Sequence, residues 1–454
     1  MKCIQKGHTL VVGLGISGRA IARYLSRLGI PFSVADTRSA PAGLDAFCSE
    51  YPNVEVHCGA LTELNLDGVS EIVLSPGVDP RTPGLETVQE RVIGEIELFV
   101  RALGQRPRPA SLLAITGSNA KSTVTTLVGE MAQEAGIRVA IGGNLGTPAL
   151  DLLTLYPDAE CFILELSSFQ LETTRHLGAD VACYLNLSED HLDRHDGMAA
   201  YGAAKQRIFA GARSAVINGD DERTSPVGTF AGTVTRFTLN APSEGDWGMA
   251  MRDGEPYLMR GDTSLIAMRE VRLQGLHNIA NVLAALAIGT CMHWSLEAMR
   301  RVLTRFAGLP HRAEFVAERD GVCWINDSKG TNVGATLAAI EGLGPTLTGK
   351  LILLAGGLGK GADFAPLAAS LGRYARVAVL YGTDADKIAQ AIEHDVPVHR
   401  VDTLVQAMQY AHGAAHAGDG VLLSPACASL DQFSNYEARG EAFRAWVQAC
   451  EDKA

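Results

Sequence analysis

Residues 9–36 read TLVVGLGISGRAIARYLSRLGIPFSVAD, and this stretch decides the fold of the N-terminal part of the chain. A short apolar run leads into a glycine-rich turn, then into a segment with helical spacing, and then into a second apolar run that ends at Asp36. Strand, turn, helix and strand in this order are typical of a parallel sheet with helices on its faces. The sequence therefore predicts an α/β domain at the N-terminus.

The turn of this unit is a strict G-x-G-x-x-G, Gly13 to Gly18, between a predicted strand and a predicted helix. Its glycines allow the backbone to approach a pyrophosphate at the helix N-terminus, where free N–H groups favour negative charge. Asp36, at the end of the next strand, and Ser75-Pro76-Gly77, after a further one, share the carboxyl edge where open sheets bind ligands. The pattern predicts a Rossmann-like domain that binds a phosphate-bearing ligand. A purely structural turn and an NAD-dependent oxidoreductase remain the alternatives.

The α/β pattern restarts twice along the 454 residues, a length that suggests about three domains. The segment 104–110, GQRPRPA, has no apolar period and reads as a linker, and AGLPH at 307–311 marks a second boundary. Residues 225–275 alternate polar and apolar with many glycines, which predicts an antiparallel addition to the central sheet. The predicted domains are 1–100, 101–308 and a Rossmann-like 309–454.

Composition excludes several classes of function. With 39 Lys and Arg against 51 Asp and Glu, the net charge of −12 provides no global positive field for nucleic acid or an anionic membrane. Nine scattered cysteines without a C-x-x-C pair suggest neither disulfides nor a zinc site, and indicate a reducing compartment. No secretion leader is visible, and the apolar segment 279–292 is shorter than the ~20 residues of a membrane span. We therefore expect a cytoplasmic monomer, with that segment as a buried helix.

A second loop, TGSNAKST at 116–123, joins a predicted buried strand to a long helix and resembles a phosphate-binding P-loop. It departs from the strict pattern at Ile115 and Ala120, where glycine is usual. Lys121 can still reach the β and γ phosphates, and Ser122 can bind Mg²⁺ at the helix start. Ala120 fits such a loop only in a backbone conformation open to a residue with a Cβ. The loop predicts a central P-loop ATPase domain, with a non-catalytic nucleotide switch as the alternative.

Two further strand ends carry charged side chains. Glu165 follows the apolar run CFIL, beside the P-loop in the usual α/β topology, where a carboxylate can hold a Mg²⁺ that bridges phosphates. The stretch 188–195, SEDHLDRH, suggests a second metal or phosphate contact, although the pattern does not choose between His191 and His195. Lys205 lies in a predicted helix, and its spacing alone is typical of a solvated residue.

Taken in order, these motifs resemble the Mur ligase family, and within it the ligases that add D-glutamate to a peptidoglycan precursor. The series is GLGISG, DTR, SPG, TGSNAKST, GGNLG, ELSSFQLE, EDHLDR, AAKQRIF, HN, GLPHR, NDSKGTN, GGLGKGADF and SPACASLDQF. The resemblance covers essentially the whole chain. It implies that the first domain binds the uridine diphosphate of UDP-N-acetylmuramoyl-L-alanine, the second binds ATP, and the third binds D-glutamate. The implied reaction forms an amide bond through an acyl phosphate.

The resemblance also implies four sets of site residues. Contacts to the UDP-substrate are expected at Ile16, Ser17, Asp36, Thr37, Arg38, Ser75, Pro76, Gly77, Asn144 and His191. Contacts to ATP are expected at Gly117, Ser118, Asn119, Ala120, Lys121, Ser122, Thr123, Asn278, Arg312 and Asp327. Contacts to D-glutamate are expected at Lys329, Thr331, Lys360, Ser429, Leu430 and Tyr436. Two Mg²⁺ ions would be held by Ser122, Glu165, His191 and a carbamoylated Lys205, and the catalytic set would be Lys121, Glu165, His191 and Lys205.

Overall fold

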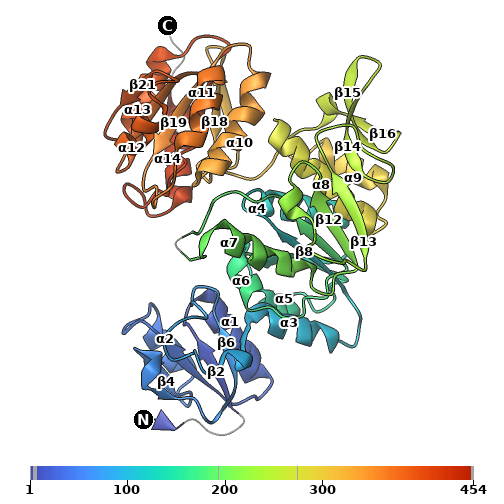
Figure 1. Ribbon diagram of the computed structural model, residues 1–454, viewed down its shortest axis with the longest axis vertical. Coiled ribbons are helices and arrows are strands. Elements are labelled where there is room, and N and C mark those ends of the chain that lie inside the picture. The colour runs from blue at the N-terminus through green and yellow to red at the C-terminus, as the bar shows by residue number, and fades with distance from the viewer. Residues whose placement is uncertain (1, 4–7, 193, 274, 451–454) are drawn as a thin grey trace.

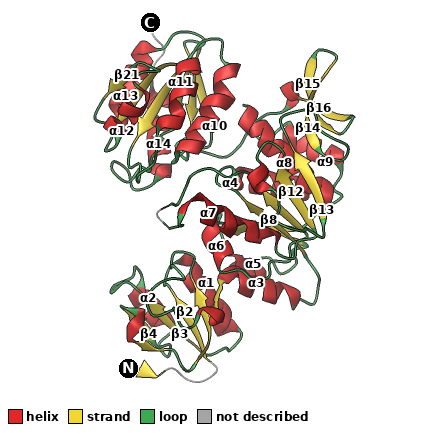
Figure 2. Ribbon diagram, in the orientation of Figure 1, coloured by secondary structure: helices red, strands yellow, loops and turns green. Residues whose placement is uncertain are grey.

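The computed structural model describes residues 2–3, 8–192, 194–273 and 275–450. Three large sheets follow one another along the long axis of the molecule, with the N-terminal part at one end and the C-terminal part at the other (Figure 1). Helices pack around the strands in each of the three parts (Figure 2). The predicted α/β class is confirmed, and each large sheet lies within one predicted domain, whose limits remain a prediction.

The first sheet has five parallel strands in the order β4-β3-β2-β6-β7. Its strands are β2 (His8–Val12), β3 (Phe32–Asp36), β4 (Val56–Cys58), β6 (Val69–Leu74) and β7 (Val92–Gly94). Its helices are α1 (Ile16–Arg27), α2 (Leu44–Glu50) and α3 (Glu95–Gly104). A separate parallel pair joins β1 (Lys2–Cys3) to β5 (Leu64–Asn65). The central strands of this sheet are buried along most of their length, as in parallel sheets that are covered on both faces.

The second sheet has nine strands in the order β16-β15-β14-β13-β12-β11-β8-β10-β9. They are β8 (Ser111–Thr116), β9 (Val139–Gly143), β10 (Cys161–Glu165), β11 (Val181–Tyr184), β12 (Ser214–Asn218), β13 (Thr233–Phe237), β14 (Trp247–Arg252), β15 (Glu255–Arg260) and β16 (Thr263–Ala267). The predicted antiparallel addition is present as β14, β15 and β16. Strand β13, which also falls in 225–275, instead pairs in parallel with β12.

Six helices accompany this sheet. They are α4 (Lys121–Glu134), α5 (Ala149–Leu155), α6 (Ser168–Glu172), α7 (Gly197–Gln206), α8 (Leu276–Cys291) and α9 (Leu296–Leu303). The apolar segment predicted as a buried helix forms most of α8, in which Ile279 and residues 282–288 are almost fully buried. In the described part of the chain, every helix is too short or too polar to cross a membrane.

The third sheet has six strands in the order β17-β18-β22-β19-β20-β21, and only its edge strand β17 runs antiparallel. Its strands are β17 (Glu314–Arg319), β18 (Val322–Asn326), β19 (Leu351–Gly356), β20 (Ala375–Tyr381), β21 (Val398–Arg400) and β22 (Gly420–Leu423). Its helices are α10 (Val333–Leu343), α11 (Ala368–Tyr374), α12 (Ala385–Ile392), α13 (Leu404–Ala414) and α14 (Tyr436–Ala449).

Strand order brings the predicted motifs of the second domain together. Strand β8 lies between β10 and β11, so Ile115 is paired with Glu165 on one side and Thr116 with Tyr184 on the other. The loops that follow these three strands therefore leave the sheet side by side at its carboxyl edge, where ligands of α/β sheets bind.

Candidate active site

A cavity of about 940 Å³ lies between the second and third sheets. The second domain contributes the P-loop 118–123, Glu165 and the loop 189–192 to its wall. The third domain contributes Arg312 and the loop 329–333. A volume of this size can hold a nucleotide with its reacting partner, since small-molecule sites span ~300–1,000 Å³.

Lys121, the first residue of α4, lies at the floor of this cavity. Its Nζ donates to the carbonyl oxygens of Gly117 at 2.8 Å and Ser118 at 2.9 Å. The helix has no side-chain cap, so the N–H groups of its first turn can face a phosphate. Burial lowers the pKa of Lys121, an effect that the carboxylates of Glu165 and Asp190 oppose. The arrangement is that of a cation and a helix N-terminus aimed at an anion.

Ala120, just before this helix, does not have the conformation we expected. Its φ of +65° and ψ of −4° lie in the left-handed region, which glycine adopts freely and which costs a residue with a Cβ ~1–2 kcal/mol. This residue makes the turn from β8 into α4. Ala120 therefore fits the loop with strain rather than in an open conformation.

Glu165 ends β10 and is 3 % exposed. Its Oε1 accepts a hydrogen bond from Asn144 Nδ2 at 2.7 Å, whereas Oε2 is buried without a hydrogen-bond partner. A buried carboxylate oxygen without a partner is costly, and it is the kind of donor that Mg²⁺ prefers. The hydroxyl of Ser122 supplies a second oxygen in the same cavity wall. The oxygen donors present therefore fit a magnesium ion.

The structure separates the two histidines between which the sequence could not choose. His191 lines the cavity, and its ring packs edge-on against Phe169 with centroids 4.9 Å apart. His195 is 5 % exposed, and its Nε2 is hydrogen-bonded to Ser168 Oγ at 3.0 Å. Of the two, His191 is the one placed to contact a ligand.

Lys205 is the clearest error of interpretation from spacing, because its side chain is 1 % exposed rather than solvated. Helix α7 lies beside the loop that follows β8, and Lys205 Nζ donates to the carbonyl of Gly117 in this loop at 2.8 Å. Nζ also lies 4.7 Å from the ring centroid of Tyr201. Burial, with a contribution from the charge of Lys121, lowers the pKa of Lys205 well below its usual value. This shift favours the uncharged form of the amine.

Among the described residues, no three His, Cys, Asp or Glu side chains lie close enough together to hold a metal ion by themselves. A metal here would need oxygen atoms from Ser122 and from bound phosphates in addition to Glu165. This donor set is typical of Mg²⁺ in nucleotide sites, where substrate phosphates complete the coordination.

The third domain reaches the P-loop through Arg312, whose Nη2 donates to Ser122 Oγ at 2.7 Å. Asp327, at the end of β18, accepts hydrogen bonds from the backbone N–H of Ala313 at 3.1 Å and from Ser424 Oγ at 2.6 Å. Burial raises the pKa of Asp327 to about 6. Arg312 and Asp327 thus lie where a nucleotide bound at the P-loop would meet the third domain.

Sequence reasoning missed Arg439, which is fully buried in α14. Its guanidinium donates to the carbonyl oxygens of Ser328 at 2.8 Å and Cys427 at 3.1 Å, and so holds the loop that carries Lys329. An arginine in a C-terminal helix gives no signal of its own, because solvated arginines are common there. Only the burial of its side chain reveals its role.

The cavity includes most, but not all, of the predicted residues. From the ATP set, it includes Ser118, Asn119, Ala120, Lys121, Ser122, Thr123, Asn278, Arg312 and Asp327, while Gly117 lies just outside. From the D-glutamate set, it includes Lys329, Thr331, Lys360 and Tyr436, while Ser429 and Leu430 do not line it. Lys329 Nζ lies 4.2 Å from the ring centroid of Tyr436. From the UDP-substrate set, it includes only Asn144 and His191.

The remaining residues of the UDP-substrate set gather at the carboxyl edge of the first sheet. Ser75 Oγ donates to the carbonyl of Gly13 at 2.9 Å, which joins the SPG loop to the glycine loop. Asp36 accepts from the backbone N–H of Leu14 at 2.7 Å and from Arg38 Nη2 at 2.7 Å. Ile16 is 75 % exposed at the start of α1, where it presents an apolar surface beside these loops.

Three family models match the chain one after another, each over the region of one of the three large sheets. Residues 7–97 match the Mur ligase MurD-like N-terminal domain, 115–289 match the Mur ligase middle domain, and 311–427 match the Mur ligase glutamate ligase domain.

Whole-chain comparisons agree with these matches. UDP-N-acetylmuramoylalanine–D-glutamate ligase from Chromohalobacter salexigens is 60 % identical, with 98 % of each chain covered. The ligase of the same name from Pseudomonas aeruginosa is 51 % identical, with 99 % of each chain covered. A solved UDP-N-acetylmuramate–alanine ligase from Thermotoga maritima shares the fold at 16 % identity, with a TM-score of 0.60 over 98 % of this chain and 100 % of that one.

A solved bifunctional folylpolyglutamate synthase/dihydrofolate synthase from Yersinia pestis also shares the fold, with 18 % identity and a TM-score of 0.58. It covers 78 % of this chain and 93 % of its own. The oxidoreductase and nucleotide-switch alternatives do not agree with a whole-chain likeness to ligases at 60 % identity. The chain belongs to the Mur ligase family.

Proposed function

We propose that this protein is an ATP-dependent ligase that joins UDP-N-acetylmuramoyl-L-alanine to D-glutamate and releases ADP and phosphate, in peptidoglycan precursor synthesis. The Mur ligase family is ATP-dependent and requires Mg²⁺. One observation carries the proposal: Lys121 and Glu165 of the second domain and Lys329 of the third line the same cavity. A phosphate site and a site for an amino-acid carboxylate thus face each other.

The chemistry follows from the poor reactivity of a carboxylate towards an amine. A carboxylate oxygen of the alanyl group attacks the γ-phosphorus of ATP, the bond to ADP breaks, and an acyl phosphate forms. The amine of D-glutamate then attacks the acyl carbon, loses a proton, and displaces phosphate as the amide forms. Lys121 and the N-terminus of α4 stabilise the phosphate charge during the first step.

Magnesium would be held by Ser122 and Glu165, with a second ion held by His191 and a carbamoylated Lys205. The metal supplies positive charge that offsets the repulsion between the nucleotide and the attacking carboxylate. The lowered pKa of Lys205 supports the carbamate, because its uncharged amine can add to carbon dioxide and lose a proton. That reaction replaces a cation by an anionic oxygen donor, which is what a metal site needs.

The other predicted roles belong to the same proposal. The UDP part of the substrate would lie along the edge of the first sheet, near the glycine loop 13–18 and the SPG loop 75–77. The D-glutamate carboxylates would contact Lys329, Thr331, Lys360, Ser429, Leu430 and Tyr436. We further propose that the protein is a monomer and acts in the cytoplasm. The eight cysteines whose side chains the structure describes are not in disulfides, which supports the reducing compartment.

The direct test measures phosphate release and product mass with ATP, Mg²⁺, UDP-N-acetylmuramoyl-L-alanine and D-glutamate. We expect one phosphate per ligated product, no turnover when either the UDP-substrate or D-glutamate is omitted, and little turnover with L-glutamate. ATP hydrolysis without a product that contains glutamate would overturn the proposal. Equal turnover with NAD or without any nucleoside triphosphate would overturn it too.

The carbamate is tested separately from the overall reaction. Protein equilibrated with ¹³C-bicarbonate should show a carbamate carbon signal that is missing in Lys205→Ala. The activity of Lys205→Ala should fall and then recover partly with added short carboxylates such as acetate or formate. Lys350→Ala, at an exposed position of the third domain, is the matched control and should keep both the signal and the activity. An unchanged carbon signal in Lys205→Ala would exclude this modification.

A further inference from the structure

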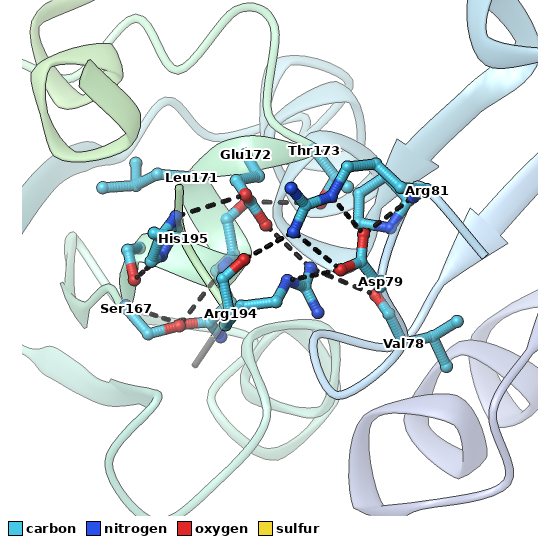
Figure 3. A network of polar contacts seen from close by, with 12 residues as sticks. Val78, Asp79, Arg81, Ser167, Leu171, Glu172, Thr173, Arg194 and His195 are labelled. Carbon is cyan, nitrogen blue, oxygen red and sulfur yellow. Dashed lines mark hydrogen bonds and ion pairs between the residues drawn. The ribbon is translucent and has the colours of Figure 1, made fainter. Parts of the chain in front are cut away.

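A chain of charged side chains connects the first domain to the second, outside the cavity described above (Figure 3). It begins at Asp79, two residues after the SPG loop 75–77 of the first domain. It ends at His195, in the loop that also carries His191. The loop expected to meet the UDP end of the substrate and the loop that faces the reacting end are therefore joined by ionic contacts.

Arg194 is the centre of this chain. Its Nε lies 3.3 Å from Asp79 Oδ2, and its Nη2 donates to Glu172 Oε2 at 2.8 Å. The other oxygen of Glu172 lies 3.5 Å from His195 Nδ1. Figure 3 shows the guanidinium between the two carboxylates, one from each domain. The contact with Glu172 is a charge-assisted hydrogen bond, which fixes direction as well as distance, whereas the contact with Asp79 is an ion pair without a hydrogen bond.

The same arginine also supports the ring that packs on His191. The Arg194 guanidinium lies 5.0 Å from the centroid of Phe169, and Phe169 contacts the His191 ring at 4.9 Å. Only 12 % of the Arg194 side chain is exposed, so removing its charge leaves the partly buried Glu172 without its arginine, whereas Asp79 keeps its ion pair with Arg81. The position of His191 thus depends on Arg194 through Phe169.

Arg81 reinforces the domain contact from the first-domain side. Its guanidinium binds Asp79 at 2.9 Å and Asp196 at 2.8 Å. It is 54 % exposed, so its ion pairs contribute less than those of Arg194. We therefore regard Arg194 as the residue on which the arrangement depends.

We propose that Arg194, held by Asp79 and Glu172, is a positioning residue that sets the SPG loop and His191 at the separation that the substrate must span. This inference rests on the proposed function, because it assumes one substrate held at both loops. Misplacement by about 1 Å can slow a positioned reaction ~100-fold, even when the change lies away from the reacting atoms. The effect should therefore appear in kcat rather than in the binding of either end alone.

The test compares Arg194→Gln with Arg23→Gln in the full-length protein. Arg23 forms a 2.5 Å ion pair with Asp151 between the same two domains but away from both loops, which makes it a matched control. For Arg194→Gln we expect kcat for ligation to fall about 10- to 100-fold, with little change in the KM for ATP or in the Kd for UDP. Arg23→Gln should stay within about twofold of the unmodified protein.

Three further variants distinguish positioning from simple loss of folding. Glu172→Gln keeps the size of the side chain and should lower kcat in the same direction while the melting temperature changes little. Arg194→Lys keeps the charge without the planar fork and should recover only part of the activity. The double variant Asp79→Asn/Arg194→Gln should lose less kcat than the two single losses combined, because both substitutions break the same contact.

The outcomes separate this inference from the proposed function. If the unmodified protein ligates D-glutamate and both Arg194→Gln and Glu172→Gln behave like Arg23→Gln, the positioning role is wrong and the function stands. Equal losses in kcat, ATP KM and UDP affinity would also overturn it, since they would indicate general disruption. If the unmodified protein forms no product, the proposed function fails and the inference falls with it.

Discussion

The two interdomain junctions of this molecule are built in opposite ways. At the first junction, Gly94 N–H donates to the carbonyl of Thr173 at 3.0 Å, and Glu97 accepts from the backbone N–H groups of Arg175 and His176. At the second, the direct hydrogen bonds come from Arg312 and Asn332, which line a cavity of about 940 Å³. The first junction fixes two domains together, whereas the second encloses space for reactants.

The third domain nevertheless packs closely against the second at one place. Helix α10 approaches α8 so closely that a Cβ on Gly342 would lie 2.0 Å from Nδ1 of His277. Burial lowers the pKa of His277 to about 4, so its ring is neutral at physiological pH. With the substrates bound to three domains, as proposed, closure at this second junction is expected to precede chemistry.

The largest effect on activity should come from a substitution in the cavity at the second junction. Lys121→Met removes the cation from the P-loop, and we expect ATP-dependent phosphate release to fall at least about 100-fold because phosphate charge in the transition state loses its stabilisation. Lys350→Met is the matched control and should retain full activity. Unchanged turnover in Lys121→Met would show that the second junction is not the site of phosphoryl transfer.

Substitutions at the first junction should instead change the free energy of unfolding. Glu95, at the start of α3, is 1 % exposed and accepts from the Leu150 N–H of α5 at 3.1 Å, and burial raises its pKa to about 7. The folded state therefore holds a proton that the unfolded chain has lost between about pH 4.5 and 7, so this group's contribution to stability declines as pH rises through that window. Above about pH 7 Glu95 is ionised in the folded state, and burial of this charge lowers the free energy of unfolding.

Glu95→Gln should remove this pH dependence. We expect the variant to match the unmodified protein near pH 4.5 and to exceed its free energy of unfolding by on the order of 3 kcal/mol at pH 8. Urea denaturation at both pH values measures the difference, with the exposed Glu63→Gln as the control. A variant less stable than the unmodified protein at pH 8 would mean that the ionised Glu95 stabilises the junction.

Arg312→Gln sharpens the contrast between the junctions. It removes the hydrogen bond from the third domain to Ser122, and we expect kcat to fall about tenfold with little loss of stability, because the bond faces the cavity and a single hydrogen bond contributes only ~1 kcal/mol. Steady-state kinetics and thermal unfolding give the two values, with the exposed Arg373→Gln for comparison. A large drop in melting temperature would place Arg312 among the structural contacts.

The smallest effect concerns the strained turn of the P-loop. Ala120→Gly should relieve the left-handed conformation and raise the free energy of unfolding by about 0.5–1 kcal/mol. Denaturant unfolding at neutral pH measures the change. The matched control is Ala411→Gly, at a buried position inside helix α13, which should be destabilising. A loss of stability in Ala120→Gly would mean that its side-chain packing outweighs the strain.

The sequence predicted the parts whose chemistry is local and left open those set by packing. The sequence alone shows a glycine turn, a lysine at a helix start and an acid at a strand end. The sheet edge that carries Lys121 and Glu165 could therefore be predicted. The burial of Lys205 could not be predicted, because helical spacing does not show which element packs against a given face of a helix. In the structure, the P-loop packs against the face of α7 that carries Lys205. Arg439 and the choice of His191 over His195 needed the same tertiary information.

The central claim is that an acid is activated by phosphoryl transfer in the cavity at the second junction. The most direct measurement uses UDP-N-acetylmuramoyl-L-alanine labelled with ¹⁸O in its carboxylate and follows the label in the released phosphate. One carboxylate oxygen should appear in each phosphate formed with product, because that oxygen bonds to phosphorus before the amide forms. Phosphate without the label, while ligated product accumulates, would contradict the account.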